Sequence, residues 1–171
     1  CTPETASPRG SVRLTVKRVS GGRVSNYLND SLKVGDSLGL FGPSGNYVLA
    51  VERSAAPLLL VAGGSGATPM IALAVEALKH SPTRKIALID GNRSETDILF
   101  RREFETLAER FATNFVIRHV LSEPPAHWFG GRGLLDAPTL RCELSELRTR
   151  HGLDAASAEI YLCGPASMMH A

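Results

Sequence analysis

Cysteine is scarce in this sequence: only three of the 171 residues are cysteines, at positions 1, 142 and 163. An odd number with no paired spacing argues against a disulfide framework and against a four-cysteine metal site. The chain also lacks the basic start and apolar run of a signal peptide. These absences fit a reducing compartment, and we therefore expect a cytoplasmic protein.

Charge of one sign and long apolar runs are lacking as well. Nineteen basic residues nearly balance seventeen acidic ones, and no block of like charge stands out. The electrostatic footprint of a nucleic-acid binder is therefore missing. The longest apolar run, residues 55–62, is interrupted by Pro57 and falls well short of the about 18 residues of a membrane span. With 43% hydrophobic and 21% charged residues, the composition is that of a globular protein with neither nucleic-acid partner nor membrane span.

Residues 1–53 have the pattern of a β-rich region. Ser11–Val19 alternates apolar and polar residues, and Ser37–Phe41 and Tyr47–Val51 are short apolar segments between glycine-containing turns. These three segments are predicted to be strands. Apolar residues at helical spacing predict one short helix at Ser25–Leu32, with Ser25 near its start.

Residues 54–171 have a different rhythm, in which apolar runs alternate with amphipathic segments. The runs predict four strands, at Leu58–Ala62, Lys85–Asp90, Phe115–Leu121 and Glu159–Cys163. Helices are predicted between them, at Pro69–His80, Ile98–Phe111 and Leu140–His151. Strands separated by helices of this length indicate a doubly wound parallel sheet. The expected fold is thus an α/β domain preceded by a β domain.

A glycine-rich loop follows the first of these α/β strands. It is the segment Gly63-Gly64-Ser65-Gly66-Ala67-Thr68-Pro69. Backbone N–H groups at the start of a helix, free of Cβ atoms, form a site that stabilises an anion such as a pyrophosphate. A tight strand-to-helix turn without any ligand is the alternative, and Pro69 stands where the usual dinucleotide fingerprint has its third glycine.

Two further segments are candidates for cofactor contact. In the β-rich half, Gly22 to Leu28 contains Ser25, which could cap a short helix whose first amides face a second phosphate. At the end of the last predicted strand, Cys163-Gly164-Pro165 is followed by Met168. Open α/β sheets bind ligands at that edge. A structural cap and a buried inert cysteine are the alternatives for these two segments.

In their order, these motifs resemble those of the ferredoxin–NADP reductase superfamily. Within this superfamily, the sequence resembles reductase components of oxygenase systems, such as the phenylacetyl-CoA and ketosteroid monooxygenase reductases. The segment from Gly22 to Leu28 is similar to the family's FAD-phosphate motif, and Gly63 to Pro69 to its nicotinamide-nucleotide loop. Cys163-Gly164-Pro165 with Met168 is similar to its C-G-P-x-x-M motif. The segment from Gly91 through Asn92 and Arg93 to Phe100, and Leu121-Ser122, also resemble the family.

The resemblance implies an FAD-binding antiparallel β-barrel followed by an NAD(P)-binding domain. Hydride would pass from NAD(P)H to FAD, and single electrons would then pass to an iron–sulfur protein. Gly22, Val24 and Ser25 would meet the FAD pyrophosphate. Gly63 to Pro69, including Gly64, Ser65, Gly66 and Thr68, would meet the nicotinamide dinucleotide. Catalytic Cys163 would sit beside the nicotinamide, with Gly164, Pro165 and Met168 around it.

Departures from the family pattern lead us to expect a fragment. The FAD-clamping R-x-Y-S motif is absent upstream of Cys1, and the segment that normally follows the C-G-P motif stops at Ala171. The barrel is therefore expected to be truncated, and the nucleotide domain to lack its last segment. No cysteine cluster could hold a 2Fe–2S centre, so such a centre is expected only in a partner or a missing fused domain.

The choice of pyridine nucleotide leans toward NADH. Ser122-Glu123 stands where NADP-selective relatives commonly have Ser-Arg, and a carboxylate would repel a 2′-phosphate. Arg93 and Arg132 remain as possible phosphate partners, and a solvated loop residue is the alternative for Glu123.

Two other functions stay open at this point. One is a Rossmann-type NAD-dependent dehydrogenase, in which Asp90 would hold the adenosine ribose, although Pro69 and the β-rich first half argue against it. The other is a nucleotide-binding module without turnover. The five histidines show no metal spacing, so no metal site is expected.

Overall fold

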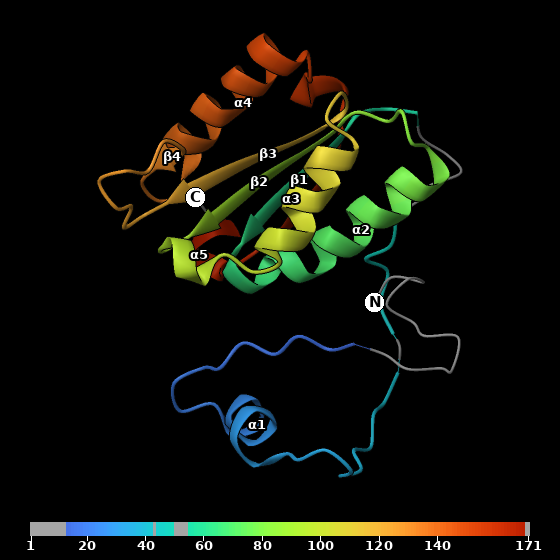
Figure 1. Cartoon of the computed structure of the whole chain (residues 1–171), viewed down its shortest axis with the longest axis vertical. Coiled ribbons are helices and arrows are strands. Elements are labelled where there is room, and N and C mark those ends of the chain that lie inside the picture. Colours follow the sequence, from blue (N-terminus) through green and yellow to red (C-terminus); the bar gives the residue numbers. More distant parts are fainter. Residues whose placement is uncertain (1–12, 43, 50–54, 170–171) are drawn as a thin grey trace.

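The centre of the fold is a parallel five-stranded sheet (Figure 1), and the structure, a computed structural model, describes residues 13–42, 44–49 and 55–169. The strands are β1 (Leu58–Gly63), β2 (Ile86–Asn92), β3 (Phe115–Leu121), β4 (Gly131–Arg132) and β5 (Glu159–Cys163). Their order across the sheet is β4-β3-β2-β1-β5. The parallel α/β fold expected from the sequence is confirmed.

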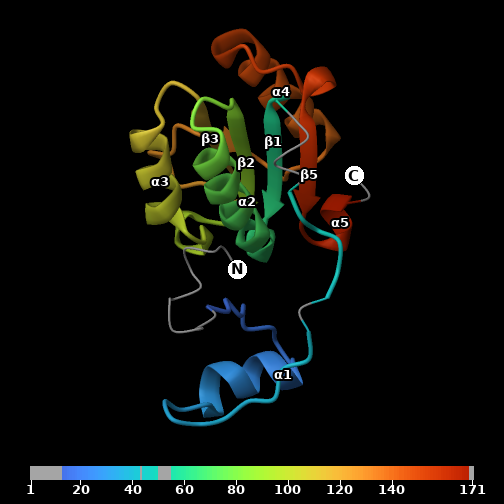
Figure 2. The ribbon, with the colours of Figure 1, turned by 90° about the vertical axis from the view of Figure 1, so that its right-hand side faces the viewer.

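Helices cover both faces of this sheet, as the figures show from two directions (Figures 1 and 2). Helices α2 (Ala67–His80) and α3 (Arg101–Arg110) cover one face, and α4 (Ala137–His151) covers the other. Alternate residues of β1 follow this arrangement, since Leu58 and Leu60 pack with α2 and α3, whereas Leu59 and Val61 pack toward α4. Each central strand is buried on both faces, which explains its continuous apolar sequence.

Shorter elements connect these layers. They are the 3₁₀ turns η2 (Gly64–Gly66), η3 (Glu95–Asp97) and η4 (Ala155–Ser157), and the short helix α5 (Ala166–Met169) after β5.

Three helix starts differ from the predicted ones. Helix α2 begins at Ala67 rather than Pro69, because proline fits within the first turn of a helix. Helix α4 begins at Ala137, directly after Asp136, whose carboxylate accepts a hydrogen bond from the Thr139 N–H at 3.0 Å. Helix α3 begins only at Arg101, because Phe100 has a left-handed backbone conformation with φ of 56°.

The predicted strands of the first half are not formed in the described residues 13–42 and 44–49. The segments predicted to be strands make no strand pairing, and the apolar side chains of Leu14, Leu38 and Leu40 in them are exposed. Strand formation requires a neighbouring strand that supplies ladder hydrogen bonds. The outer residues of the predicted strands, 11–12 and 50–51, lie outside the described residues.

The one predicted helix of this half is present but differs in its start and in its cap. It consists of α1 (Arg23–Asn26) and a π-helical turn, η1 (Tyr27–Ser31), and begins after Gly22. The Ser25 hydroxyl does not cap it; the Ser25 oxygen accepts a hydrogen bond from the Val19 N–H at 3.2 Å.

Strand β5 contacts the N-terminal half of the chain. The Tyr161 hydroxyl donates a hydrogen bond to the Val48 carbonyl at 2.9 Å, and the rings of Tyr47 and Tyr161 meet edge to face with centroids 5.4 Å apart. This contact brings the first half of the chain to the edge of the sheet where β5 ends. Within the described residues, every helix is too short or too polar to cross a bilayer.

Candidate functional site

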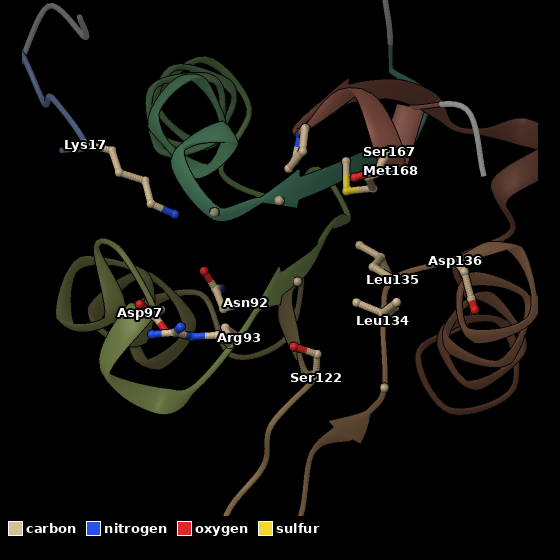
Figure 3. Close-up of a pocket in the computed structure, with 15 residues that line it drawn as sticks. Lys17, Asn92, Arg93, Asp97, Ser122, Leu134, Leu135, Asp136, Ser167 and Met168 are labelled. Atoms are coloured by element: carbon tan, nitrogen blue, oxygen red, sulfur yellow. The ribbon is translucent and has the colours of Figure 1, made fainter. Parts of the chain in front are cut away.

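The strand order reverses at the carboxyl ends of β1 and β5. The chain proceeds from β1 outward to β2, β3 and β4, and then returns to place β5 on the opposite side of β1. Such a reversal leaves a crevice where ligands bind in open α/β sheets. A cleft of about 520 Å³ lies along this edge, between the ends of the strands and the loops that follow them (Figure 3).

The glycine loop forms one wall of the cleft and packs tightly on the segment after β5. A Cβ atom on Gly63 would come within 2.8 Å of the Met168 sulfur and 2.9 Å of Pro165 Cδ. Gly66 is closer still, since its Cβ would stand 2.6 Å from the carbonyl carbon of Cys163. The loop therefore needs glycine at both positions, and the two motifs found far apart in the sequence form one unit.

The start of the 3₁₀ turn η2, which continues directly into α2, presents positive charge density at this wall. The Ala67 N–H already bonds to the carbonyls of Gly64 and Ser65, and Pro69 has no N–H. The N–H groups without an intrahelical acceptor are therefore the first ones of η2, which has no side-chain cap. Gly64 at the cleft has φ of +53°, a conformation that favours glycine. Of the other predicted loop residues, Ser65 is exposed at the tip, and Thr68 and Pro69 lie half-buried in the first turn of α2.

Lys17 is a cleft residue that the sequence did not reveal. Its Nζ atom lies 3.3 Å from the position that a Cβ on Gly64 would occupy, and it reaches the cleft from the N-terminal half of the chain (Figure 3). An ammonium group beside free helix amides complements a phosphate. In the sequence, Lys17 is one polar residue of an alternating segment, and nothing local distinguishes it from its neighbours.

Cys163 ends β5 and is half-buried against the core on the α2 side of the sheet. It does not line the cleft itself; Pro165, Ser167 and Met168 do. Partial burial raises the pKa of Tyr47 to about 12, with smaller contributions from Cys163 and Tyr161. Tyr47 thus brings a neutral phenol near Cys163 at physiological pH.

Asn92, Arg93 and Ser122 form the opposite wall, at the ends of β2 and β3. The Ser122 N–H donates to the Asn92 carbonyl at 3.0 Å, which joins the two strand ends. Arg93 is exposed and lies 3.5 Å from Asp97. The Ser94 hydroxyl donates to Asp97 at 2.7 Å, and this bond, followed by the charge of Arg93, lowers the pKa of Asp97.

Glu123 and Arg132 lie outside the cleft lining. Glu123 is exposed next to Ser122, and its N–H donates to the Arg93 carbonyl at 2.8 Å. Arg132 donates to the carbonyl of Trp128 at 2.7 Å and to those of Pro125 and Ala126 at 3.3 Å each. Its guanidinium group thus holds the loop after β3.

The predicted FAD-phosphate residues lie on a separate element, away from the sheet (Figures 1 and 2). Gly22 precedes α1, and a Cβ there would collide with the Ser25 hydroxyl. Glycine is therefore required for the turn that lets Ser25 reach back to Val19. Val24 is exposed.

Asp90 is fully buried, and its carboxylate accepts hydrogen bonds from Asn92 and His119. It cannot contact a ribose directly, as the dehydrogenase alternative requires. Leu134 and Leu135, which were not singled out in the sequence, line the cleft from the loop before α4. The described residues contain no group of three or more histidine, cysteine, aspartate or glutamate side chains that could hold a metal ion.

Comparison with known families identifies the class. Residues 60–171 match the oxidoreductase NAD-binding domain family, and residues 2–49 match the oxidoreductase FAD-binding domain family. The chain belongs to this family of FAD- and NAD-binding oxidoreductases, which is part of the ferredoxin–NADP reductase superfamily.

The chain is similar to several individual proteins of this class. It is 36% identical over 163 residues to NADH-cytochrome b5 reductase 2 of Emericella nidulans, covering 95% of this chain and 48% of that protein. It is 34% identical to the glycine betaine monooxygenase reductase subunit of Pseudomonas aeruginosa, covering 94% of this chain and 42% of that protein. The chain thus spans about half the length of the curated relatives it matches.

Solved structures agree with this assignment. The CS-b5R domains of human Ncb5or, in the NAD+ form, match with a TM-score of 0.72 and 30% identity, covering 91% of this chain and 42% of that one. The cytochrome b5 reductase domain of Ulva prolifera nitrate reductase matches with a TM-score of 0.69 and 27% identity, covering 87% of this chain and 58% of that one.

Proposed function

We propose that this protein is an FAD-dependent NAD(P)H oxidoreductase that passes electrons on to a protein acceptor. The observation that carries the proposal is the glycine-walled cleft at the β1–β5 reversal, which Lys17 reaches from the half of the chain that matches an FAD-binding domain. A cleft lined by residues of both parts of the chain suits a reaction between a cofactor bound by one part and a cofactor bound by the other.

The residues of the cleft fit a pyridine dinucleotide. Gly63 and Gly66 leave no room for a Cβ, and Gly64 has the left-handed backbone that a close turn needs. The first N–H groups of η2, together with Lys17, complement a pyrophosphate. The apolar side chains of Leu134 and Leu135 provide a dry wall on the other side of the cleft.

The segment around α1 offers hydrogen-bond donors that suit a phosphate of FAD. The first amides of α1 have no intrahelical acceptor, and the Ser25 hydroxyl, which accepts from Val19, keeps its own proton for donation. When bound, a flavin supplies the chemistry of taking two electrons as hydride and releasing them singly. The chain would supply position and charge.

Cys163 is proposed as the residue beside the nicotinamide. It is the last residue of β5, the strand beside β1 where the strand order reverses. The contact between the rings of Tyr47 and Tyr161 holds the N-terminal part of the chain against β5. The Cys163 backbone pairs in register with Ala62 of β1, so its thiol lies at the end of a paired strand. Rigid placement of a side chain near reacting atoms contributes to rate through orientation.

The acceptor is proposed to be an iron–sulfur protein or ferredoxin domain of an oxygenase system. The similarity to the glycine betaine monooxygenase reductase subunit supports this choice. The similarity to NADH-cytochrome b5 reductases favours a cytochrome b5-type haem protein as a second candidate. A cytoplasmic location is part of the proposal, as is a preference for NADH, which the exposed carboxylate of Glu123 next to the cleft supports.

The test is purification of the full-length protein, followed by measurement of flavin absorbance and of ferricyanide reduction by NADH. Bound flavin with NADH-dependent reduction is expected. Absence of both would refute an oxidoreductase function. Reduction of a 2Fe–2S ferredoxin and of cytochrome b5 is then compared under the same conditions, and faster reduction of the cytochrome would overturn the iron–sulfur choice.

A further inference from the structure

Three polar side chains interrupt an apolar face of the sheet just below the cleft. Asp90 on β2 pairs in register with His119 on β3, and Asn92 lies two residues after Asp90 on the same face. On that face the preceding residues of β2, Ile86 and Leu88, belong to the core under α2 and α3. Buried polar side chains that follow apolar ones on the same face of a strand are not explained by packing alone.

These side chains are joined by hydrogen bonds. Oδ2 of Asp90 accepts from Nδ2 of Asn92 at 2.8 Å and from Nδ1 of His119 at 3.1 Å. A carboxylate can only accept, so the amide group of Asn92 that faces it must be the NH₂. The Asn92 carbonyl oxygen is thereby turned away from Asp90, and Figure 3 shows it directed toward Lys17 and the start of α2.

The Asn92 carbonyl oxygen has no hydrogen-bond partner among the described residues. Asn92 is only 9% exposed, yet it is one of the residues that line the cleft. A buried acceptor without a donor is costly, and native proteins rarely keep one without a ligand or water to satisfy it. A hydrogen-bond donor is therefore missing at this point of the cleft wall.

The position of Asn92 narrows the chemistry of that donor. Across the cleft, on the side toward which the Asn92 carbonyl oxygen is directed, Lys17 and the first N–H groups of η2 complement a pyrophosphate. In a pyridine dinucleotide, the hydrogen-bond donors that adjoin the pyrophosphate are ribose hydroxyls, because the carboxamide and the adenine amino group lie at the two far ends.

We propose that Asn92 Oδ1 accepts a hydrogen bond from a ribose hydroxyl of the bound dinucleotide, and that Asp90, held by His119, is the positioning residue that fixes the Asn92 amide. The inference rests on the proposed dinucleotide cleft. It differs from the arrangement in which a carboxylate binds the ribose itself. Here the buried carboxylate acts through the amide.

The test measures calorimetric binding of ADP-ribose and of inorganic pyrophosphate to the full-length protein. Asn92→Ala and Asp90→Asn should each weaken ADP-ribose binding about five- to tenfold, the range expected for one hydrogen bond. Pyrophosphate, which has no hydroxyl, should bind all variants equally. The double variant should bind ADP-ribose no more weakly than Asn92→Ala alone, because Asp90 acts only through Asn92.

Asn114→Ala is the matched control. The Asn114 side-chain NH₂ donates hydrogen bonds to the carbonyls of Pro82 and Arg84, at the opposite end of the sheet from the cleft.

Additive losses in the double variant would overturn the positioning role of Asp90. Equal losses for ADP-ribose and pyrophosphate would overturn recognition of a hydroxyl. Analogues of ADP-ribose that each lack one ribose hydroxyl provide a measurement on the unaltered protein, and equal affinity for all of them would also refute the inference. Failure of the unaltered protein to bind ADP-ribose at all would instead refute the proposed function.

Discussion

Gly66 lies directly against the backbone of Cys163, so that a methyl group on Gly66 would stand 2.6 Å from the Cys163 carbonyl carbon and closer still to its oxygen. Neither partner is the end of a flexible side chain, and strand β5 is fixed by its pairing with β1. The glycine loop and the cysteine motif therefore cannot move apart without disturbing the sheet.

Replacing Gly66 by alanine should lower the free energy of unfolding by about 3 kcal/mol, because the added methyl overpacks two fixed backbone segments. Urea denaturation measures this change. Gly39→Ala is the control, since a Cβ on Gly39 meets no atom within 4 Å and its effect should stay within about 0.5 kcal/mol. Similar losses in the two variants would contradict the close approach.

Removing the charge of Lys17 should weaken dinucleotide binding. Lys17→Ala is expected to raise the Kd of ADP-ribose about fivefold at low salt, and the difference should shrink as salt screens the charge. Calorimetry at two salt concentrations tests this. Lys33→Ala, an exposed lysine of the same half of the chain, should leave the Kd unchanged. If both substitutions raised the Kd equally, the loss of affinity would come from the lower net charge of the protein and not from the position of Lys17 in the cleft.

Nucleotide preference should respond to the loop after β3. Ser122→Ala combined with Glu123→Arg replaces a carboxylate near the cleft by a guanidinium that can pair with a 2′-phosphate. The ratio of kcat/KM for NADPH to that for NADH should rise about tenfold or more. Glu109→Arg, at the exposed end of α3, makes the same charge change elsewhere and should not alter the ratio. An unaltered ratio in the loop variant would remove this loop from nucleotide selection.

Cys163 should affect hydride transfer more than cofactor binding. Cys163→Ala is expected to slow flavin reduction by NADH about tenfold in rapid mixing, while flavin content and ADP-ribose affinity remain the same. Cys142→Ala, on the exposed side of α4, is the matched control. An unaltered rate would leave Cys163 with a structural role only.

The hydrogen bond between Ser94 and Asp97 should make the free energy of unfolding fall at acid pH. The Ser94 hydrogen bond lowers the pKa of Asp97 in the folded protein, so this contribution is complete above the unfolded value of about 4 and is lost as pH falls through the lower folded pKa. Between pH 5 and pH 3, Asp97→Asn should therefore lose less stability than the unaltered protein. Thermal unfolding measures this, with Glu109→Gln as control. Parallel pH curves for Asp97→Asn and the unaltered protein would contradict the prediction.

Much of the α/β half could be predicted from the sequence because its physical signals are local. Buried parallel strands need continuous apolar runs, and β1 and the first part of β2 have them. The less buried strands β3 and β5 are still mainly apolar, although Arg118 and His119 interrupt β3. The two-residue strand β4 has no such run, since it exists only by pairing with the end of β3. The start of α3 was also missed, because the left-handed backbone of Phe100 depends on its surroundings rather than on its residue type.

The candidate site was predictable in its backbone parts and less so in its side chains. The glycine loop and the cysteine motif have sequence patterns, and the structure brings them together. The Asn92 residue was among those predicted, but its hydrogen bond to Asp90 and the place of Lys17 in the cleft became visible only through the fold. The strands predicted for the first half depend on pairing that no local pattern can establish.

The contact of Tyr161 with Val48 joins residues 113 positions apart. During synthesis on the ribosome, the first half of the chain emerges long before the strand that it docks on. The sheet can add β2 and β3 to β1 as they appear, but β5 completes it only when nearly the whole described chain has been made. Docking of the first half through Tyr47 and Val48 must therefore be a late folding event.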